Sequence, residues 1–149
     1  MSDGVPPRPR YTRLVDAVEA VRRVLEGRAD VRLAYLFGSV ARGEGRASSD
    51  LDVGVVFSPV PAAAELDRLA IELEVAASRR VDLAVLNDAP PLLTHEAIRA
   101  NRLIVCRDED ERVRFHTHAT ARYLDTARLR RVQHAYLRER AEAHRARST

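Results

Sequence analysis

The sequence predicts an α/β (α+β) domain in which helices pack on a small mixed sheet and a long helix closes the chain. Three observations support this fold class. The length of 149 residues fits a single domain. A composition of 46% hydrophobic and 32% charged residues is typical of a chain that folds around a core. Helical apolar periodicity also alternates along the sequence with short runs of β-forming residues.

The first part of the chain contains one expected helix and two expected strands. Over residues 11–26, apolar residues recur at spacings of four, three and four, which predicts an amphipathic helix that stops at Gly27. Residues 31–37 and 50–57 are short apolar runs rich in β-forming residues, so each predicts a strand. The Gly-, Ser- and Arg-rich segment 38–49 between them predicts a loop.

Helices and strands continue to alternate in the next part. Residues 62–77 are rich in Ala, Leu and Glu and predict a helix, and residues 80–86 predict a third strand. A further helix is expected near residues 92–100, and a short apolar run at residues 102–106 predicts a fourth strand. Elements in this order build one sheet with helices packed on it.

A helical pattern begins after Asp108 and runs almost to the end of the chain. Asp108 is a suitable N-cap, and the three acidic residues that follow it lie favourably in the first helical turn. Beyond Arg138 the sequence is polar on all sides, so this part either frays or packs on another chain. We therefore expect a flexible arm at residues 1–10, a core at residues 11–107, and a C-terminal helix with an Arg-rich tail at residues 108–149.

The composition excludes several kinds of chemistry. All 25 basic residues are arginine, so no mechanism that requires a catalytic lysine is available. Cys106 is the only cysteine, which excludes an internal disulfide and a cysteine-based zinc site. It follows an apolar run, so we expect a buried structural thiol. No segment is long and apolar enough for a transmembrane helix and no signal peptide is recognisable, so we expect a cytoplasmic protein without membrane contact.

Charge is distributed unevenly along the chain. Residues 1–75 carry a net charge of −2, whereas residues 112–149 carry +7. A basic tail favours an acidic partner, either nucleic acid or a protein. A general preference for arginine over lysine in this sequence is the alternative explanation.

Three aspartates stand out on two of the expected strands. Asp50 and Asp52 are two residues apart, so on a strand their side chains project from the same face. Adjacent carboxylates repel each other unless a cation lies between them, and oxygen ligands suit Mg²⁺. Asp82 lies in an otherwise apolar strand, where an unpaired charge is costly. If the strands 50–57 and 80–86 are neighbours, the three carboxylates can hold two metal ions for phosphoryl transfer.

Gly38 and Ser39 directly follow the first expected strand. A glycine at a strand end lets the backbone approach a ligand closely. The N–H and hydroxyl groups of Ser39 can bond to a phosphate, particularly if the next residues begin a helix. Aspartates that bind metal beside a serine that binds phosphate indicate a site for a metal-bound nucleoside triphosphate.

The spacing of these residues resembles a known signature. Residues 38–52 consist of a Gly-Ser pair, ten further residues and then Asp-x-Asp. This pattern is similar to the motif of the DNA-polymerase-β-like nucleotidyltransferase superfamily. The segment 36–53 resembles in particular the minimal nucleotidyltransferase (MNT) group of that superfamily, and a weaker resemblance extends over residues 11–125. It implies that residues 11–107 form a polymerase-β-like nucleotidyltransferase core.

The resemblance also implies which residues form the site. The catalytic and metal-binding residues are Asp50, Asp52 and Asp82. The residues that bind the nucleotide are Gly38, Ser39, Arg42 and Ser49. The cofactor is Mg²⁺, with two ions, and the substrate is ATP. A solvated loop charge is the alternative interpretation of Arg42.

Many members of the MNT group are MntA-type antitoxins, each paired with a HEPN-domain ribonuclease toxin. The resemblance therefore implies that the chain transfers AMP from ATP to a tyrosine of the toxin, neutralises it, and forms a hetero-oligomer with it. Two alternatives stay open: nucleotidyl transfer to a small molecule, and a non-catalytic antitoxin that neutralises its partner by binding alone. Direct contact with nucleic acid is not expected.

Overall fold

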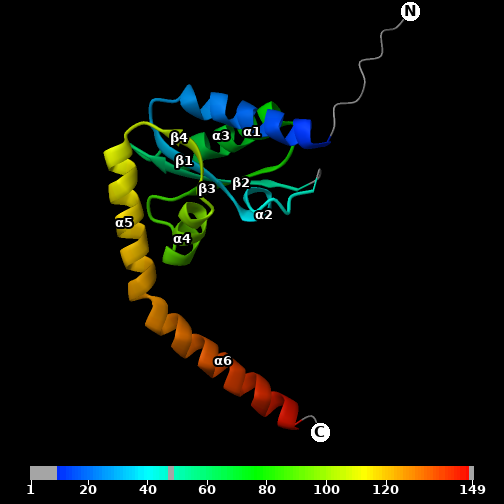
Figure 1. The fold of residues 1–149 in the computed structure, drawn as a ribbon, viewed down its shortest axis with the longest axis vertical. Helices are drawn as coiled ribbons and strands as arrows, with labels where there is room; N and C mark the ends of the chain where they lie inside the picture. Colours follow the sequence, from blue (N-terminus) through cyan, green and yellow to red (C-terminus); the bar gives the residue numbers. More distant parts are fainter. Residues whose placement is uncertain (1–9, 47–48, 148–149) are drawn as a thin grey trace, which may run out of the picture.

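A four-stranded sheet forms the centre of the computed structural model, which describes residues 10–46 and 49–147 (Figure 1). Its strands are β1 (Val31–Phe37), β2 (Leu51–Phe57), β3 (Val81–Val85) and β4 (Arg102–Cys106). The strand order is β3-β2-β1-β4, in which β2 and β3 are parallel and β1 is antiparallel to both of its neighbours. The mixed sheet is confirmed, and β2 and β3 are the neighbours that a cluster of the three aspartates requires.

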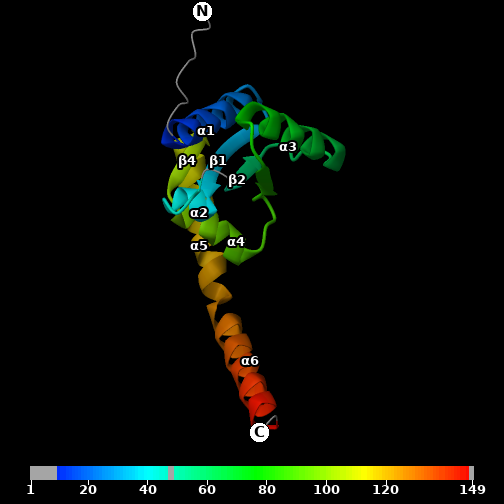
Figure 2. The same ribbon diagram turned by 90° about the vertical axis from the view of Figure 1, so that its right-hand side faces the viewer.

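Helices cover both faces of this sheet, so the domain has three layers (Figure 2). The helices are α1 (Arg10–Glu26), α2 (Gly38–Ala41), α3 (Ala63–Ala77), α4 (Pro91–Arg99), α5 (Glu109–Asp125) and α6 (Ala127–Arg147). α1 and α3 pack on one face, and α4 and α5 pack on the other. The single turn of α2 follows β1 directly, at the end of the sheet where β2 and β3 begin.

Two apolar clusters hold the layers together. The larger cluster lies under α1 and α3, and includes Val53 and Val55 of β2 together with Leu73 of α3. The smaller cluster lies under α4 and α5, and includes Tyr35 of β1 and Ala97 of α4. Along β2 and β3, alternate residues enter opposite clusters because successive strand side chains point to opposite faces.

Hydrogen bonds organise the start of α5, and one of them joins it to the sheet. Asp108 caps the helix as predicted, because its side chain accepts hydrogen bonds from the backbone N–H groups of Asp110 and Glu111 at 2.8 and 3.4 Å. Arg32 of β1 donates to the Glu111 carboxylate at 2.8 Å. The N-terminal half of α5 is therefore part of the domain.

The single long helix expected at the C-terminus is divided at Thr126. After this residue α6 continues in a different direction from α5 (Figure 1). The Thr126 hydroxyl donates to the carbonyl oxygens of Arg122 and Tyr123 at 3.1 and 3.0 Å. A side-chain hydroxyl that bonds to the preceding turn favours a bend in a helix, which accounts for the interruption.

Cys106 is exposed, so the expectation of a buried thiol was wrong. β4 is an edge strand, and of its residues Ile104 and Val105 are buried. Cys106 ends the strand, where its side chain leaves the apolar cluster, and its Sγ lies 3.5 Å from the carbonyl oxygen of Asp108. The apolar run indicated the strand correctly, but an edge strand buries only part of such a run.

Of the expected N-terminal arm, residues 1–10, only Arg10 belongs to the described residues, and it begins α1. The helix ends at Glu26, directly before Gly27, as the sequence predicts. None of the described helices combines the length and the apolar character that crossing a lipid bilayer requires.

Candidate active site

Asp52 and Asp82 lie side by side near the start of the two parallel strands. The register of β2 and β3 pairs Asp52 directly with Asp82, and paired residues project from the same face of a sheet. That face is the one covered by α4 and α5, since Ala84 packs against the smaller cluster. Val53 and Leu83 lie one residue further along and pack in or against the larger cluster. The alternation therefore places both carboxylates on one face.

The Asp52 carboxylate is partly buried and has like charges around it. Burial raises its pKa above the ordinary value, and the negative charges of Asp82 and Asp50 raise the pKa further. The positive charge of Arg42 acts in the opposite direction and is the weakest of these influences. Asp50 precedes β2 and is exposed. The site thus concentrates negative charge that a divalent cation would neutralise.

Gly38 packs the turn between β1 and α2 against the Asp52 side chain. Its φ of +69° lies in the left-handed region that favours glycine. A Cβ at this position would overlap the carboxylate of Asp52, with Oδ2 as the nearest atom. A residue larger than glycine would therefore displace either the turn or the carboxylate.

The loop between α2 and β2 is organised by its own polar groups. Arg42 Nε donates to the Glu44 carboxylate at 3.2 Å on the surface. Ser49 Oγ accepts a hydrogen bond from the backbone N–H of Arg46 at 2.7 Å, and the Arg79 guanidinium donates to the Ser49 carbonyl oxygen at 3.2 Å. Ser49 thus shapes the loop that leads into β2, and its contact with a nucleotide stays a prediction.

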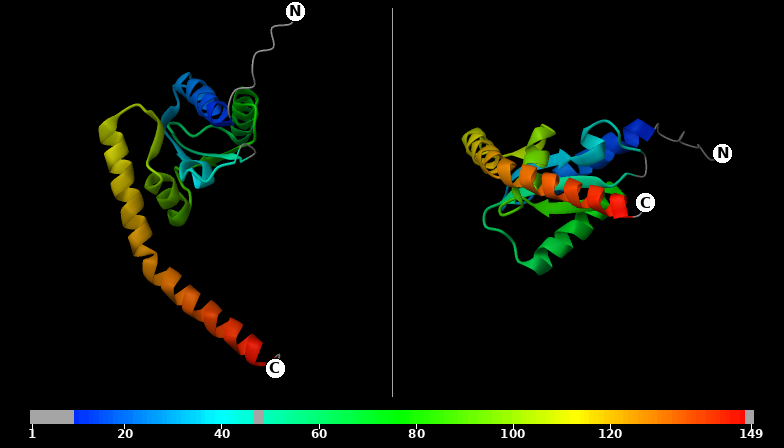
Figure 3. Two further views of the ribbon diagram at one scale, coloured as in Figure 1. Left: turned by 45° about the vertical axis from the view of Figure 1, so that its right-hand side comes forward. Right: turned by 90° about the horizontal axis from the view of Figure 1, so that it is seen from below.

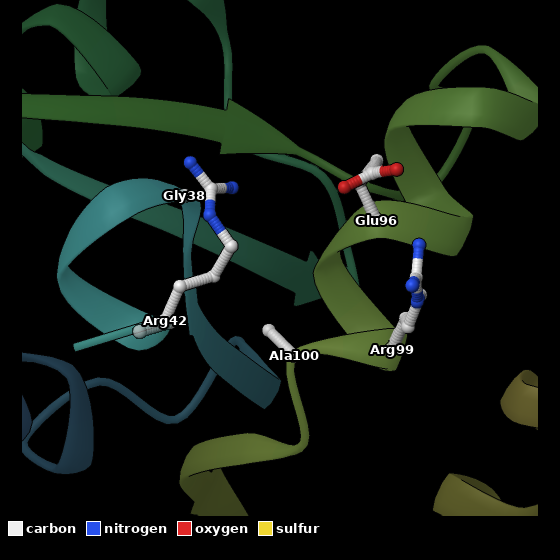
Figure 4. A pocket seen from close by; sticks show the side chains of 6 residues that line it. Gly38, Arg42, Glu96, Arg99 and Ala100 are labelled. Atoms are coloured by element: carbon white, nitrogen blue, oxygen red, sulfur yellow. The ribbon is translucent and has the colours of Figure 1, made fainter. Parts of the chain in front are cut away.

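A pocket of about 280 Å³ opens between α2 and α4, next to the Gly38 turn (Figure 4). Its lining residues are Gly38, Ala41, Arg42, Glu96, Arg99 and Ala100. The Arg42 side chain extends from one wall, whereas those of Glu96 and Arg99 project from the opposite wall (Figure 4). Two guanidinium groups therefore line a pocket that adjoins the carboxylate pair through Gly38.

The sequence alone did not single out Glu96 or Arg99. Both lie on α4 at positions that are exposed in the structure. Charged residues on the outer face of an amphipathic helix are normally solvated, so their pattern carries no signal of a site. Only the position of α4 opposite α2 places these two residues in the pocket next to Gly38.

The donor set of the site fits a hard divalent cation. Asp50, Asp52 and Asp82 offer carboxylate oxygens, the ligands that Mg²⁺ prefers. Burial and then the like charges of Asp82 and Asp50 raise the pKa of Asp52, and a cation bound there would offset both effects. The side chains are not closed around one point: within residues 10–46 and 49–147, no three His, Cys, Asp or Glu side chains are grouped to hold one ion. The strand register sets the positions of Asp52 and Asp82, whereas Asp50 lies just before β2.

The structure brings together the central residues predicted for the site. Asp52 is paired with Asp82 and contacts Gly38, and Arg42 lines the pocket that begins at Gly38. Ser39 follows Gly38 in the same turn of α2 and is partly buried. Their catalytic and binding roles stay predictions.

Comparison with known proteins relates most of the chain to one family. Residues 19–110 match the family model described as polymerase beta, nucleotidyltransferase. A candidate protein adenylyltransferase of Methanocaldococcus jannaschii is 40% identical over 63 residues, which are 42% of this chain and 68% of that protein.

Solved structures share the fold. A chain in a toxin–antitoxin complex with AMP-PNP superimposes with a TM-score of 0.70 at 21% identity, and the match covers 80% of this chain and 97% of that chain. A chain in the complex of a tri-AMPylated Shewanella oneidensis HEPN toxin with an MNT antitoxin gives a TM-score of 0.62 at 18% identity, covering 87% and 98% of the two chains. At these identities the similarity establishes the architecture of the chain.

Proposed function

Because the chain belongs to the polymerase-β nucleotidyltransferase family, we propose that it is an antitoxin that transfers AMP from ATP to a tyrosine of a HEPN-domain ribonuclease toxin and thereby neutralises the toxin. One observation carries the proposal. The register of β2 and β3 pairs Asp52 with Asp82, and the Gly38 turn packs against the Asp52 side chain. Paired carboxylates beside a tight turn suit a metal-dependent transfer of a nucleotidyl group.

The related proteins support a protein as the acceptor. The Methanocaldococcus jannaschii relative is named for protein adenylylation. The Shewanella oneidensis complex contains an MNT antitoxin together with an AMPylated HEPN toxin, and another complex of the same fold contains the ATP analogue AMP-PNP. We therefore favour a protein acceptor over a small molecule.

ATP is proposed to bind at the α2 turn and in the adjoining pocket. Gly38 and Ser39 begin the turn, where backbone N–H groups are available to phosphate oxygens. Arg42 and Arg99 line the pocket from two different helices, and the planar guanidinium group is suited to bidentate phosphate contacts. Since the chain contains no lysine, arginine must supply the positive charge. The triphosphate would thus lie beside Asp52.

Asp50, Asp52 and Asp82 are proposed to hold Mg²⁺. When bound, Mg²⁺ offsets charge on the phosphates and lowers the pKa of the attacking hydroxyl. The chain contributes a rigid pair of carboxylates, because the register of two hydrogen-bonded strands sets the positions of Asp52 and Asp82. It also partly shields Asp52 from water, which strengthens electrostatic interactions at that carboxylate.

In the proposed step, the tyrosine oxygen attacks the α-phosphorus of ATP and forms the new P–O bond. The bond from the α-phosphorus to the oxygen that bridges to the β-phosphorus breaks, and pyrophosphate leaves. The tyrosine proton passes to a carboxylate oxygen of Asp82, which is exposed toward an incoming acceptor. Arg42 and Arg99 stabilise the charge that develops on the leaving pyrophosphate.

ATP labelled on its α-phosphate tests this proposal. Incubation of the full chain with labelled ATP, Mg²⁺ and the HEPN-domain protein encoded beside it should label that protein. Asp50→Asn and Asp52→Asn should abolish the labelling, whereas Asp67→Asn, a matched change on the exposed side of α3, should leave it intact. Tight binding to the HEPN-domain protein without labelling would overturn the proposal and indicate a non-catalytic antitoxin. Label found only on a small molecule would show that the acceptor is that molecule and not a protein.

A further inference from the structure

α6 extends away from the domain as a helical arm (Figure 1). Its described side chains after Arg130 are all exposed. A helix that makes so few contacts with its own domain adds little to folding, because most helical stability comes from packing of an apolar face. The arm is therefore a surface for which the chain itself supplies no cover.

An apolar stripe runs along this arm. Leu129, Val132 and Tyr136 are three and four residues apart, so they share one face of the helix. Their exposed fractions are 64%, 61% and 56%. Leu137 borders the same face. Contiguous apolar side chains on an exposed helix mark a contact surface for another molecule. We refer to Leu129, Val132 and Tyr136 as the arm stripe.

The first turn of the arm is attached to the domain in a defined way. The Arg130 guanidinium lies 3.9 Å from the centre of the Tyr123 ring and donates to the Tyr123 carbonyl oxygen at 2.8 Å. The Tyr123 ring also stacks on His95 of α4, with centroids 3.7 Å apart and planes at 8°. These contacts join α4, α5 and α6, so the direction of the arm is set by the domain.

The far end of the arm points away from the domain, on the same side of the molecule as α2 (Figure 1). Seen from below, α6 runs from the α5 side across to the side where α2 lies (Figure 3). Figure 1 shows the C-terminal end of α6 below α2 in the same way. A molecule held along the arm would therefore face the end of the domain that carries Gly38 and Asp52.

The charge of the arm indicates the chemistry of its partner. α6 contains seven arginines and two glutamates. Arg140 lies 5.6 Å from the Tyr136 ring and donates to the Tyr136 hydroxyl at 3.2 Å, so positive charge accompanies the stripe itself. A complementary surface is an apolar groove with acidic residues along its rims.

We propose that α6 is the docking arm for the acceptor protein, whose acidic-rimmed apolar groove receives Leu129, Val132 and Tyr136. The proposal rests on the proposed function for the identity of the acceptor and adds the surface that holds it. It corresponds to the recognition mode in which an amphipathic helix lays its apolar face into a groove. The bend at Thr126 then presents the docked protein to the carboxylate pair.

A protein fits the arm better than RNA or a second copy of the chain. A phosphate backbone would engage the arginines but leave the arm stripe uncovered. Two arms of this composition would repel each other, since each carries a large excess of arginine over glutamate. An acidic protein surface satisfies both the charge and the apolar face.

The affinity of the full chain for the HEPN-domain protein encoded beside it tests the proposal. Val132→Glu/Tyr136→Glu places two negative charges in the arm stripe. The matched variant His134→Glu/Ala141→Glu places two negative charges on the side of the same helix that faces away from the arm stripe. We expect the first variant to raise Kd at least tenfold and the second to change it by less than threefold, with wild-type binding weakened by added salt. Far-ultraviolet circular dichroism of both variants should match the wild type.

The outcomes separate this inference from the proposed function. Equal affinity of the two double variants would overturn the docking arm, whether or not AMP is transferred. Stripe-dependent binding without AMP transfer would uphold the docking arm and refute the proposed activity. The proposal would also be overturned if the wild-type chain bound a short RNA oligonucleotide, or formed a homodimer, and only the stripe variant lost this binding. The arm stripe would then bind RNA or a second copy of the chain.

Discussion

The domain and its arm use the same residue type in opposite ways. Leu73 of α3 is completely buried in the larger cluster, whereas Leu137 of α6 exposes 61% of its surface. Burial of the first leucine removes apolar surface from water and stabilises the fold. Leu137 contributes no such stabilisation as long as α6 is not bound to another molecule. The stability of the chain therefore resides in the layers around the sheet, and the apolar residues of α6 serve association.

The candidate active site differs from both regions because it places a charged side chain within the sheet. Asp52 sits within the sheet, where the neighbouring strand residues Val53 and Val55 are fully buried. Its raised pKa shows that the fold holds the charged carboxylate at a cost. Side chains with shifted pKa values are concentrated at functional sites of proteins. Variants at the site should therefore change activity without loss of stability, and core variants should do the reverse.

Asp52→Asn should separate activity from stability most clearly. We expect AMP transfer to fall by about a thousandfold, because removal of a metal-binding carboxylate removes charge stabilisation in the transition state. The free energy of unfolding in urea should not fall, since the substitution removes like-charge repulsion with Asp82. A variant that unfolds at markedly lower urea than the wild type would show that Asp52 is structural.

Leucine truncation compares the two regions directly. Leu73→Ala should lower the free energy of unfolding by about 2–5 kcal/mol, because it leaves a cavity in the larger cluster. Leu137→Ala should change it by less than about 0.5 kcal/mol, as for other exposed positions. Equal losses in the two variants, measured by denaturant unfolding, would mean that α6 packs on the domain in solution.

Gly38→Ala should disturb the turn next to the carboxylate pair. We expect a loss of about 1–3 kcal/mol in unfolding free energy and a large loss of AMP transfer, because an alanine there is strained and overlaps Asp52. Gly43 provides the control: it also has a positive φ, of +76°, but no atom lies within 4 Å of the Cβ site. If Gly43→Ala impairs transfer as strongly as Gly38→Ala, backbone strain alone explains the effect.

Much of the site was predictable because it depends on strand geometry. The alternation of Asp52 with Val53, and of Asp82 with Leu83, indicated the face of each aspartate, and the neighbouring position of β2 and β3 then made them partners. The Gly-Ser pair before the loop indicated the turn, which the structure places against Asp52. Period-two patterns carry this information in the sequence itself.

The remaining features depend on contacts between distant segments. Arg99 enters the pocket only because α4 packs opposite α2, and no local pattern encodes that placement. The exposure of Cys106 depends on which strand lies at the sheet edge. The bend at Thr126 depends on a side-chain hydrogen bond that competes with a sequence otherwise suited to a continuous helix.

The stability of the metal-free chain should depend on pH through Asp52. Its pKa is raised in the folded state, so its stabilising contribution is fully present below the unfolded pKa of about 3.9 and is lost as pH rises through the folded pKa. In the presence of a chelator, the unfolding free energy of the wild type should therefore fall relative to that of Asp52→Asn over this range. A constant difference between the two proteins would show that the pKa of Asp52 is not shifted.

The central claim is that the carboxylates paired across β2 and β3 carry out AMP transfer. Its most direct test is the intact mass of the HEPN-domain protein after incubation with ATP, Mg²⁺ and the wild-type chain, Asp82→Asn, or the exposed control Asp88→Asn. The account predicts covalent AMP with the wild type and the control, and transfer at least about a hundredfold slower with Asp82→Asn. Transfer at the wild-type rate by Asp82→Asn would contradict it.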